Sequence, residues 1–114
     1  MDSVIEVEDQ GRVALVHLQL PHIDMFNVTE LLEAFQPVFN KKPPFIILDM
    51  NQTQFIDSSG MGGLIRIHQE VKSYTGVFMV AGLTPKVNNL LRLTRSNQYL
   101  RCFDTVAMAL EAAR

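Results

Sequence analysis

The reactive side chains of this sequence gather in one short run, the Asp-Ser-Ser-Gly-Met-Gly segment at positions 57–62. Two hydroxyl groups, those of Ser58 and Ser59, follow the carboxylate of Asp57, and either Ser can cap a helix by accepting a backbone N–H bond. A helix start leaves about four N–H groups without partners and carries a partial positive charge of roughly half a unit. The run therefore suits either a plain helix cap or a place for a phosphate group.

Glycines are dense in the same run. Gly60, Gly62 and Gly63 fall in the first turns of the expected helix, where each Gly costs up to about 1 kcal/mol relative to Ala. They expose the backbone and leave open space above the helix start. We expect this space to allow the close approach of another molecule.

Two elements on either side must position this run. The unbroken apolar stretch at 45–50 predicts a strand buried on both faces. After the run, a stripe of residues spaced by three and four predicts a helix over 59–74 that ends at Gly76 and packs on that strand. The stripe consists of Met61, Leu64, Ile65, His68 and Val71. The two Ser residues are thus expected where a central strand passes into a helix.

The run and its surroundings resemble the signature of the STAS-domain anti-sigma factor antagonists. The likeness rests on the run itself, on the preceding Phe55-Ile56 and on a central strand that ends in Asp49. The order of strands and helices along nearly the whole chain also fits that family. The resemblance implies the STAS fold and a regulatory role.

The resemblance also implies a role for each residue near the run. Ser58, directly after the Asp, matches the Ser that a partner anti-sigma factor, which is also an ATP-dependent serine kinase, phosphorylates in that family. Asp24, which follows Ile23 at the end of an earlier strand, matches the acidic residue beside the phosphorylation site. The other supporting residues are Asp57, Ser59, Gly60, Met61 and Gly62.

The chain departs from the family pattern at two places. Pro21-His22-Ile23-Asp24 stands where a Gly-polar-apolar-Asp turn is usual, which bears on the placement of Asp24. Thr94-Arg95-Ser96 stands where Thr-Gly-apolar is common, so a helix end and a partner-facing surface are expected to differ there.

The rest of the chain alternates strands and helices. A hairpin is predicted at 4–8 and 12–20, further strands at 77–81 and 99–103, and helices after Asn27, Thr84 and Asp104. Asn27 and Glu30 form a capping-box pattern, with Phe26 and Leu31 placed as a hydrophobic staple. We therefore expect one α/β domain over 1–114, of order ββαβαβαβα, with a STAS-like mixed sheet of about five strands covered by about four helices.

The bulk properties exclude several classes of function. A net charge of −2 provides no basic field, which argues against nucleic acid as a partner. No apolar run approaches the roughly 18–20 residues of a membrane span, and the lone Cys102 fits a reducing cytosol, so a cytoplasmic protein is expected. His17, His22 and His68 lack the clustering of zinc ligands, and we expect no metal or cofactor.

The leading hypothesis is a phosphorylation-controlled binding module without enzymatic activity. The unmodified protein binds a cytoplasmic anti-sigma factor that is also a kinase and frees that kinase's client. Phosphorylation on Ser58 abolishes this binding, and a serine phosphatase restores the unmodified form. The alternative is a module that binds a nucleotide or another anion and regulates a transporter or lipid-transport complex, although no Lys or Arg stands beside the glycines. A serine hydrolase is excluded because Asp-Ser-Ser-Gly is not a Gly-x-Ser-x-Gly elbow.

Overall fold

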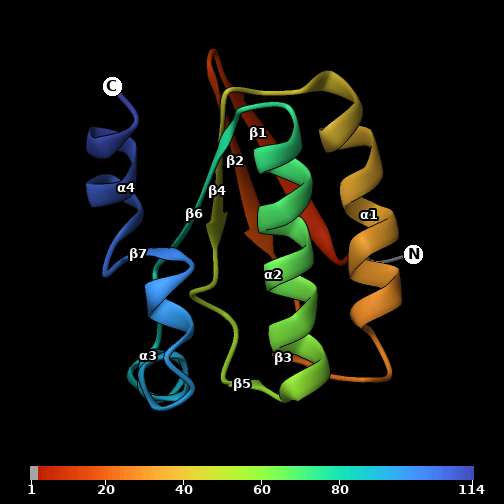
Figure 1. Ribbon diagram of the computed structural model, residues 1–114, viewed down its shortest axis with the longest axis vertical. Helices are drawn as coiled ribbons and strands as arrows, with labels where there is room; N and C mark the ends of the chain where they lie inside the picture. The colour runs from red at the N-terminus through yellow and green to blue at the C-terminus, as the bar shows by residue number, and fades with distance from the viewer. Residues whose placement is uncertain (1–2) are drawn as a thin grey trace.

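A mixed sheet of five strands forms the centre of the fold, and the computed structural model describes it within residues 3–114 (Figure 1). The strands are β1 (Ile5–Gln10), β2 (Val13–Leu18), β3 (His22–Ile23), β4 (Phe45–Asp49), β5 (Phe55–Ile56), β6 (Val77–Ala81) and β7 (Arg101–Phe103). The helices are α1 (Val28–Lys41), α2 (Ser58–Ser73), α3 (Pro85–Leu93) and α4 (Val106–Ala112), with a 3-10 turn η1 (Ser96–Gln98). The predicted fold class and the order of the longer elements are confirmed.

The strand order of the sheet is β1-β2-β4-β6-β7. The hairpin strands β1 and β2 are antiparallel, whereas β2, β4, β6 and β7 are parallel to one another. Parallel neighbours need a crossover, and α1, α2 and α3 lie in the three connections. As a consequence, β4 lies in the middle of the sheet and its carboxyl end leads toward α2.

Two apolar cores lie on opposite faces of the sheet. Alternate residues of β4 point to the two faces, so that Ile46 and Leu48 pack under α1 and α2 while Ile47 packs under α4. All three are fully buried, as the unbroken apolar run predicts. Figure 1 shows α1 and α2 side by side over one face, with α4 on the opposite side of the sheet. The start of α2 is therefore held by the larger core.

A second, very short sheet was not expected from the sequence. Strands β3 and β5 pair in parallel, with His22 opposite Phe55 and Ile23 opposite Ile56. Each strand has only two residues, too few to give an alternating pattern. This small sheet joins the segment before α1 to the segment before α2.

Two predicted boundaries near the C-terminus are wrong. The last strand begins at Arg101 rather than at position 99, since the preceding residues form η1 and leave Tyr99 exposed. The last helix is capped by Thr105 rather than by Asp104, because the Thr105 hydroxyl accepts the Met108 N–H bond. None of the helices within residues 3–114 is both long and apolar enough to cross a membrane.

Candidate functional site

Helix α2 begins one residue earlier than predicted, and its cap is a carboxylate. The Oδ1 atom of Asp57 accepts the Gly60 N–H bond at 2.8 Å, so Asp57 is the N-cap and Ser58 the first helical residue. The expectation that either Ser caps the helix is therefore wrong. An Asp in the cap position also places a negative charge at the positive end of the helix dipole, which stabilises the helix start.

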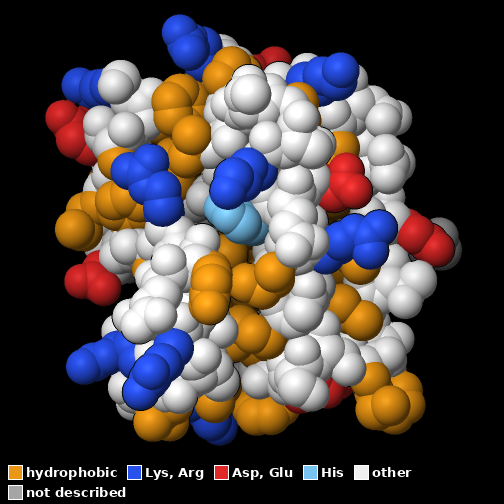
Figure 2. Space-filling model, viewed as in Figure 1, with side chains coloured by type: hydrophobic (Ala, Val, Ile, Leu, Met, Phe, Trp, Pro, Cys, Tyr) orange, Lys and Arg blue, Asp and Glu red, His pale blue; other side chains and the backbone are white. Residues whose placement is uncertain are grey.

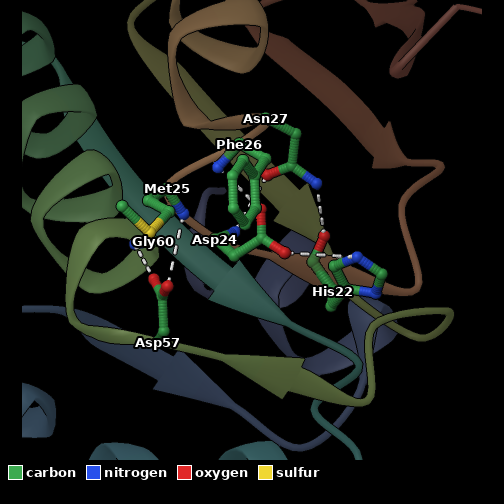
Figure 3. A network of polar contacts seen from close by, with 7 residues as sticks. All are labelled: His22, Asp24, Met25, Phe26, Asn27, Asp57 and Gly60. Atoms are coloured by element: carbon green, nitrogen blue, oxygen red, sulfur yellow. Dashed lines mark hydrogen bonds and ion pairs between the residues drawn. The ribbon is translucent and has the colours of Figure 1, made fainter.

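The same carboxylate holds the neighbouring loop in place. Its second oxygen, Asp57 Oδ2, accepts the Met25 N–H bond at 3.2 Å (Figure 3). The Asp57 N–H group donates to the Ile23 carbonyl at 3.1 Å. Because both oxygens are engaged, Asp57 ties the loop after β3 to the start of α2. Asp57 thus acts as a structural clamp between the two segments.

Asp24 lies in this loop, next to the start of α2, as the resemblance implies. Its Oδ1 atom accepts the Phe26 N–H bond at 2.9 Å, and its Oδ2 atom lies 3.3 Å from Nε2 of His22. Pro21 does not disturb this placement, since its carbonyl accepts the Gln54 N–H bond at 2.7 Å and the missing N–H group is not needed there. Both oxygens of the Asp24 carboxylate therefore contact residues of its own segment, next to the start of α2.

The predicted capping box and staple before α1 are both wrong. Asn27 Oδ1 accepts the Asp24 N–H bond at 2.9 Å and Asn27 Nδ2 donates to the His22 carbonyl at 2.9 Å, so the amide folds back over the loop instead of capping α1. Leu31 is fully buried, whereas 87% of Phe26 is exposed, so the two side chains do not form a staple. The loop directs Phe26 outward.

The site consequently carries apolar side chains that sequence reasoning left out. Met25 is 66% exposed, and Phe55, on the strand that pairs with β3, is 43% exposed. Together with Phe26 they stand on the two segments that flank the polar helix start. Two adjacent apolar residues, Met25 and Phe26, follow Asp24 in the sequence and could have indicated this surface. The prediction that Phe26 forms a staple with Leu31 hid that possibility. Exposed apolar groups of this kind mark protein contacts when they gather on one surface.

The glycines divide into two kinds. A Cβ atom on Gly60 would collide with the backbone of Ile23, with 2.9 Å to its carbonyl carbon, and one on Gly63 would lie 2.5 Å from Cγ2 of Val28. These two glycines are needed for packing within the chain. Of the three glycines in this run, only Gly62 faces open space, with no atom within 4 Å of an added Cβ. The expected room for another molecule is thus confined to Gly62.

Ser58 is exposed and Ser59 is half-buried, at the first and second positions of α2. Within residues 3–114 neither hydroxyl makes a hydrogen bond, and their backbone N–H groups also have no partner. Met61 follows on the same turn and is half-buried against the larger core. The structure thus brings together all seven predicted site residues around the helix start, with the Ser58 hydroxyl open to solvent.

Comparisons with known proteins agree with this arrangement. Residues 4–109 match the sequence profile of the STAS domain. A Thermotoga maritima protein named "Putative anti-sigma factor antagonist" is 29% identical over 81 residues, which is 71% of this chain and 72% of that protein. The crystal structure of an anti-sigma factor antagonist from Mycobacterium paratuberculosis is 27% identical, with a TM-score of 0.84, and the match covers 95% of this chain and 91% of that one.

A more distant structure shares the fold. SpoIIAA of Bacillus in its phosphorylated form has a TM-score of 0.69 at 17% identity, over 96% of this chain and 99% of that one. The matched profile spans both cores, the small sheet and the start of α2, and the resemblance first noted in the Asp-Ser-Ser-Gly run is confirmed. The chain belongs to the STAS domain family, among relatives named as anti-sigma factor antagonists.

Proposed function

We propose that this protein is a phosphorylation-switched antagonist of an anti-sigma factor. The observation that carries the proposal is the exposed Ser58 hydroxyl at the first position of α2, on a surface that also presents Met25 and Phe26. The names of the relatives point to an anti-sigma factor as the partner. We infer that this partner is also an ATP-dependent serine kinase in the cytoplasm and that Ser58 is its substrate.

The unmodified protein binds the partner through the apolar groups around Ser58. Phe26 is the best anchor because nearly all of its ring area is available for burial, and aromatic anchors at the centre of an interface contribute most of the binding energy. Binding places the Ser58 hydroxyl against the ATP of the kinase, which displaces the kinase's client. The kinase then transfers the γ-phosphoryl group to Ser58 Oγ, the hydroxyl proton passes to a base of the kinase, and ADP leaves.

Phosphorylation reverses the contact through charge. The phosphate adds about −1.5 to −2 units next to the carboxylates of Asp57 and Asp24, in a surface that must lose water when the partner binds. Turning a mostly bound population into a mostly free one takes about 5 kcal/mol of differential affinity. Like charges brought together at an interface cost several kcal/mol, which is of the required size.

The reset requires an outside enzyme, because the protein in this proposal binds and is modified but does not catalyse. We assign that step to a serine phosphatase of the metal-dependent class, which hydrolyses the phosphoserine ester and restores the hydroxyl. The solved phosphorylated form of the distant relative SpoIIAA supports a stable phosphoprotein intermediate in this family. The unsatisfied N–H groups at the start of α2 would stabilise the phosphate once it is attached.

The decisive experiment weighs the intact protein after incubation with ATP and each candidate anti-sigma factor kinase of the same cell. We expect one added phosphate on the wild type and on Ser59→Ala, and none on Ser58→Ala. Addition that survives Ser58→Ala would assign the modification elsewhere. If no kinase adds phosphate, the alternative of an anion-binding module regulating a transporter or lipid-transport complex takes precedence, and titration with nucleotides then tests it.

A further inference from the structure

The segment over positions 85–101 differs in charge from the rest of the chain. It carries four basic side chains, Lys86, Arg92, Arg95 and Arg101, and no acidic one, whereas the remaining residues hold all twelve Asp and Glu and only six Lys and Arg. The protein is therefore locally positive on an overall negative background. Figure 2 shows Lys and Arg side chains over the region of α3.

The same segment exposes large apolar groups that its own core does not use. Val87 and Leu91 form the buried side of α3, while Leu93 is 81% exposed and Tyr99 is 67% exposed. On α3, Asn89, Arg92 and Leu93 line a shallow hollow. We call Arg92, Leu93, Arg95, Tyr99 and Arg101 the arginine-rich edge. Apolar groups rimmed by charge are typical of a surface that binds another protein.

The arginines are not engaged in ion pairs of their own. Within residues 3–114 no carboxylate lies at ion-pair distance from Arg92, Arg95 or Arg101. The Arg101 guanidinium instead stacks 5.8 Å from the centre of the Phe103 ring. Guanidinium groups without a carboxylate partner in their own chain favour the binding of an acidic partner.

Arg95 stands in a backbone conformation that suits Gly. Its φ angle is 59°, in the left-handed region, and its N–H group donates to the Arg92 carbonyl at 3.1 Å to close α3. Gly adopts this conformation without strain, whereas a residue with a Cβ atom does so only at a cost. This is also the position at which the sequence departs from the Thr-Gly-apolar pattern. Arg95 thus stands where the turn itself would be more stable with Gly.

We propose that the arginine-rich edge is a second contact for the anti-sigma factor and selects a partner whose docking surface carries carboxylates around an apolar side chain. This inference rests on the proposed function of Ser58. The N-terminal end of α3 lies beside the Ser58 surface, because α3 packs against β5 and the Thr84 hydroxyl, at its cap, donates to the Thr53 carbonyl at 3.1 Å. The arginine-rich edge begins at the other end of this nine-residue helix, about 12 Å further along its axis.

An interface of ordinary size is large enough for one partner to cover both the Ser58 surface and the arginine-rich edge. A standard complex buries about 800 Å² on each side, which is a disc of about 16 Å radius. The molecule measures 31 × 30 × 24 Å, so a disc centred on Ser58 extends across most of one side and reaches α3. The Ser58 region then provides the switch and the arginine-rich edge provides the discrimination between partners.

The test uses Arg95→Gly and the anti-sigma factor that phosphorylates Ser58 in the experiment above. We expect the variant to unfold at a higher urea concentration than the wild type, and to bind the partner about tenfold more weakly in isothermal titration. The double variant Arg92→Glu/Arg95→Glu should bind more weakly still, and this loss should shrink as salt is raised. Lys72→Glu, a matched charge reversal near the end of α2, should bind like the wild type.

The outcomes separate this inference from the proposed function. If no kinase modifies Ser58, both fall together. If Ser58 is modified but Arg95→Gly binds the partner as tightly as the wild type, only the second contact is overturned. It is also overturned if the arginine variants lose instead a salt-sensitive affinity for phosphatidylglycerol vesicles, or a concentration-dependent dimer in light scattering, with partner binding unchanged.

Discussion

Because Gly60 has no side chain, the start of α2 can lie directly against the backbone of β3. An added Cβ would meet the Ile23 backbone and would lie 2.7 Å from Cγ2 of Ile56, and a backbone atom cannot swing aside. We expect Gly60→Ala to lower the free energy of unfolding by about 1–3 kcal/mol, as overpacking does. Gly62→Ala is the control: it enters open space in the same helix and should raise stability by up to about 1 kcal/mol. Urea unfolding of both variants measures this, and equal shifts in the same direction would contradict the packing role of Gly60.

For individual residues, the sequence predicted which of them lie near the start of α2 but not which hydrogen bonds each one makes. Asp24 lies on the segment that Asp57 ties to the start of α2, next to Ser58, because the strand order brings these segments together. The exposure of Phe26 was not predictable from local pattern, since Asn27 and Glu30 have the spacing of a capping box. The Asn27 side chain instead bonds back to His22 and Asp24, in the segment that β5 holds through His22 and Ile23. A tertiary contact thus overrode a local signal.

Among the elements, α2 is fixed at both ends by bonds to distant segments. Its C-terminal cap residue Tyr74 donates its hydroxyl to the Pro43 carbonyl at 2.8 Å, which ties the helix to the link between α1 and β4. Burial raises the pKa of the Tyr74 phenol, because the charged form is poorly solvated there. The neutral phenol is therefore favoured in the folded protein, and its contribution is complete below about pH 10 and is lost as the pH rises through the higher folded pKa.

Tyr74→Phe should consequently lower stability by about 1 kcal/mol at pH 7, since a hydrogen bond is lost and the Pro43 carbonyl is left without it. Between pH 8 and pH 10.5 the wild type should lose more stability than the variant, which has no phenol to ionise. Urea midpoints at the two pH values measure this. Tyr99→Phe, at an exposed position, should follow the wild type at both. Parallel pH profiles for wild type and Tyr74→Phe would exclude a role for this phenol.

The longer elements were predictable because each carries its own hydrophobic pattern along the chain. Helix α2 and strand β4 were both found within a residue of their expected ends. The predicted stripe of α2 was only partly right: Leu64 and Val71 are buried, but so is Ile67, which the stripe left out. The other three stripe residues are half-buried: Met61, Ile65 and His68. The short pair β3 and β5 was not, because two residues pair only after the larger sheet has brought them together. The same holds for η1, where Arg95 turns the chain and shortens the last strand.

For the whole molecule, the proposed switch is separable from stability, because the two cores lie on either side of the sheet and Ser58 belongs to neither. Ser58→Asp adds one negative charge at the first turn of α2, where the helix dipole favours it and Asp57 opposes it. We expect the free energy of unfolding to change by less than about 0.5 kcal/mol, while the affinity for the anti-sigma factor falls at least about tenfold. Ser73→Asp adds the same charge at the far end of α2 and should bind normally. An unchanged affinity for Ser58→Asp would mean that added charge is not the switch, and the phosphate would then have to act by its bulk.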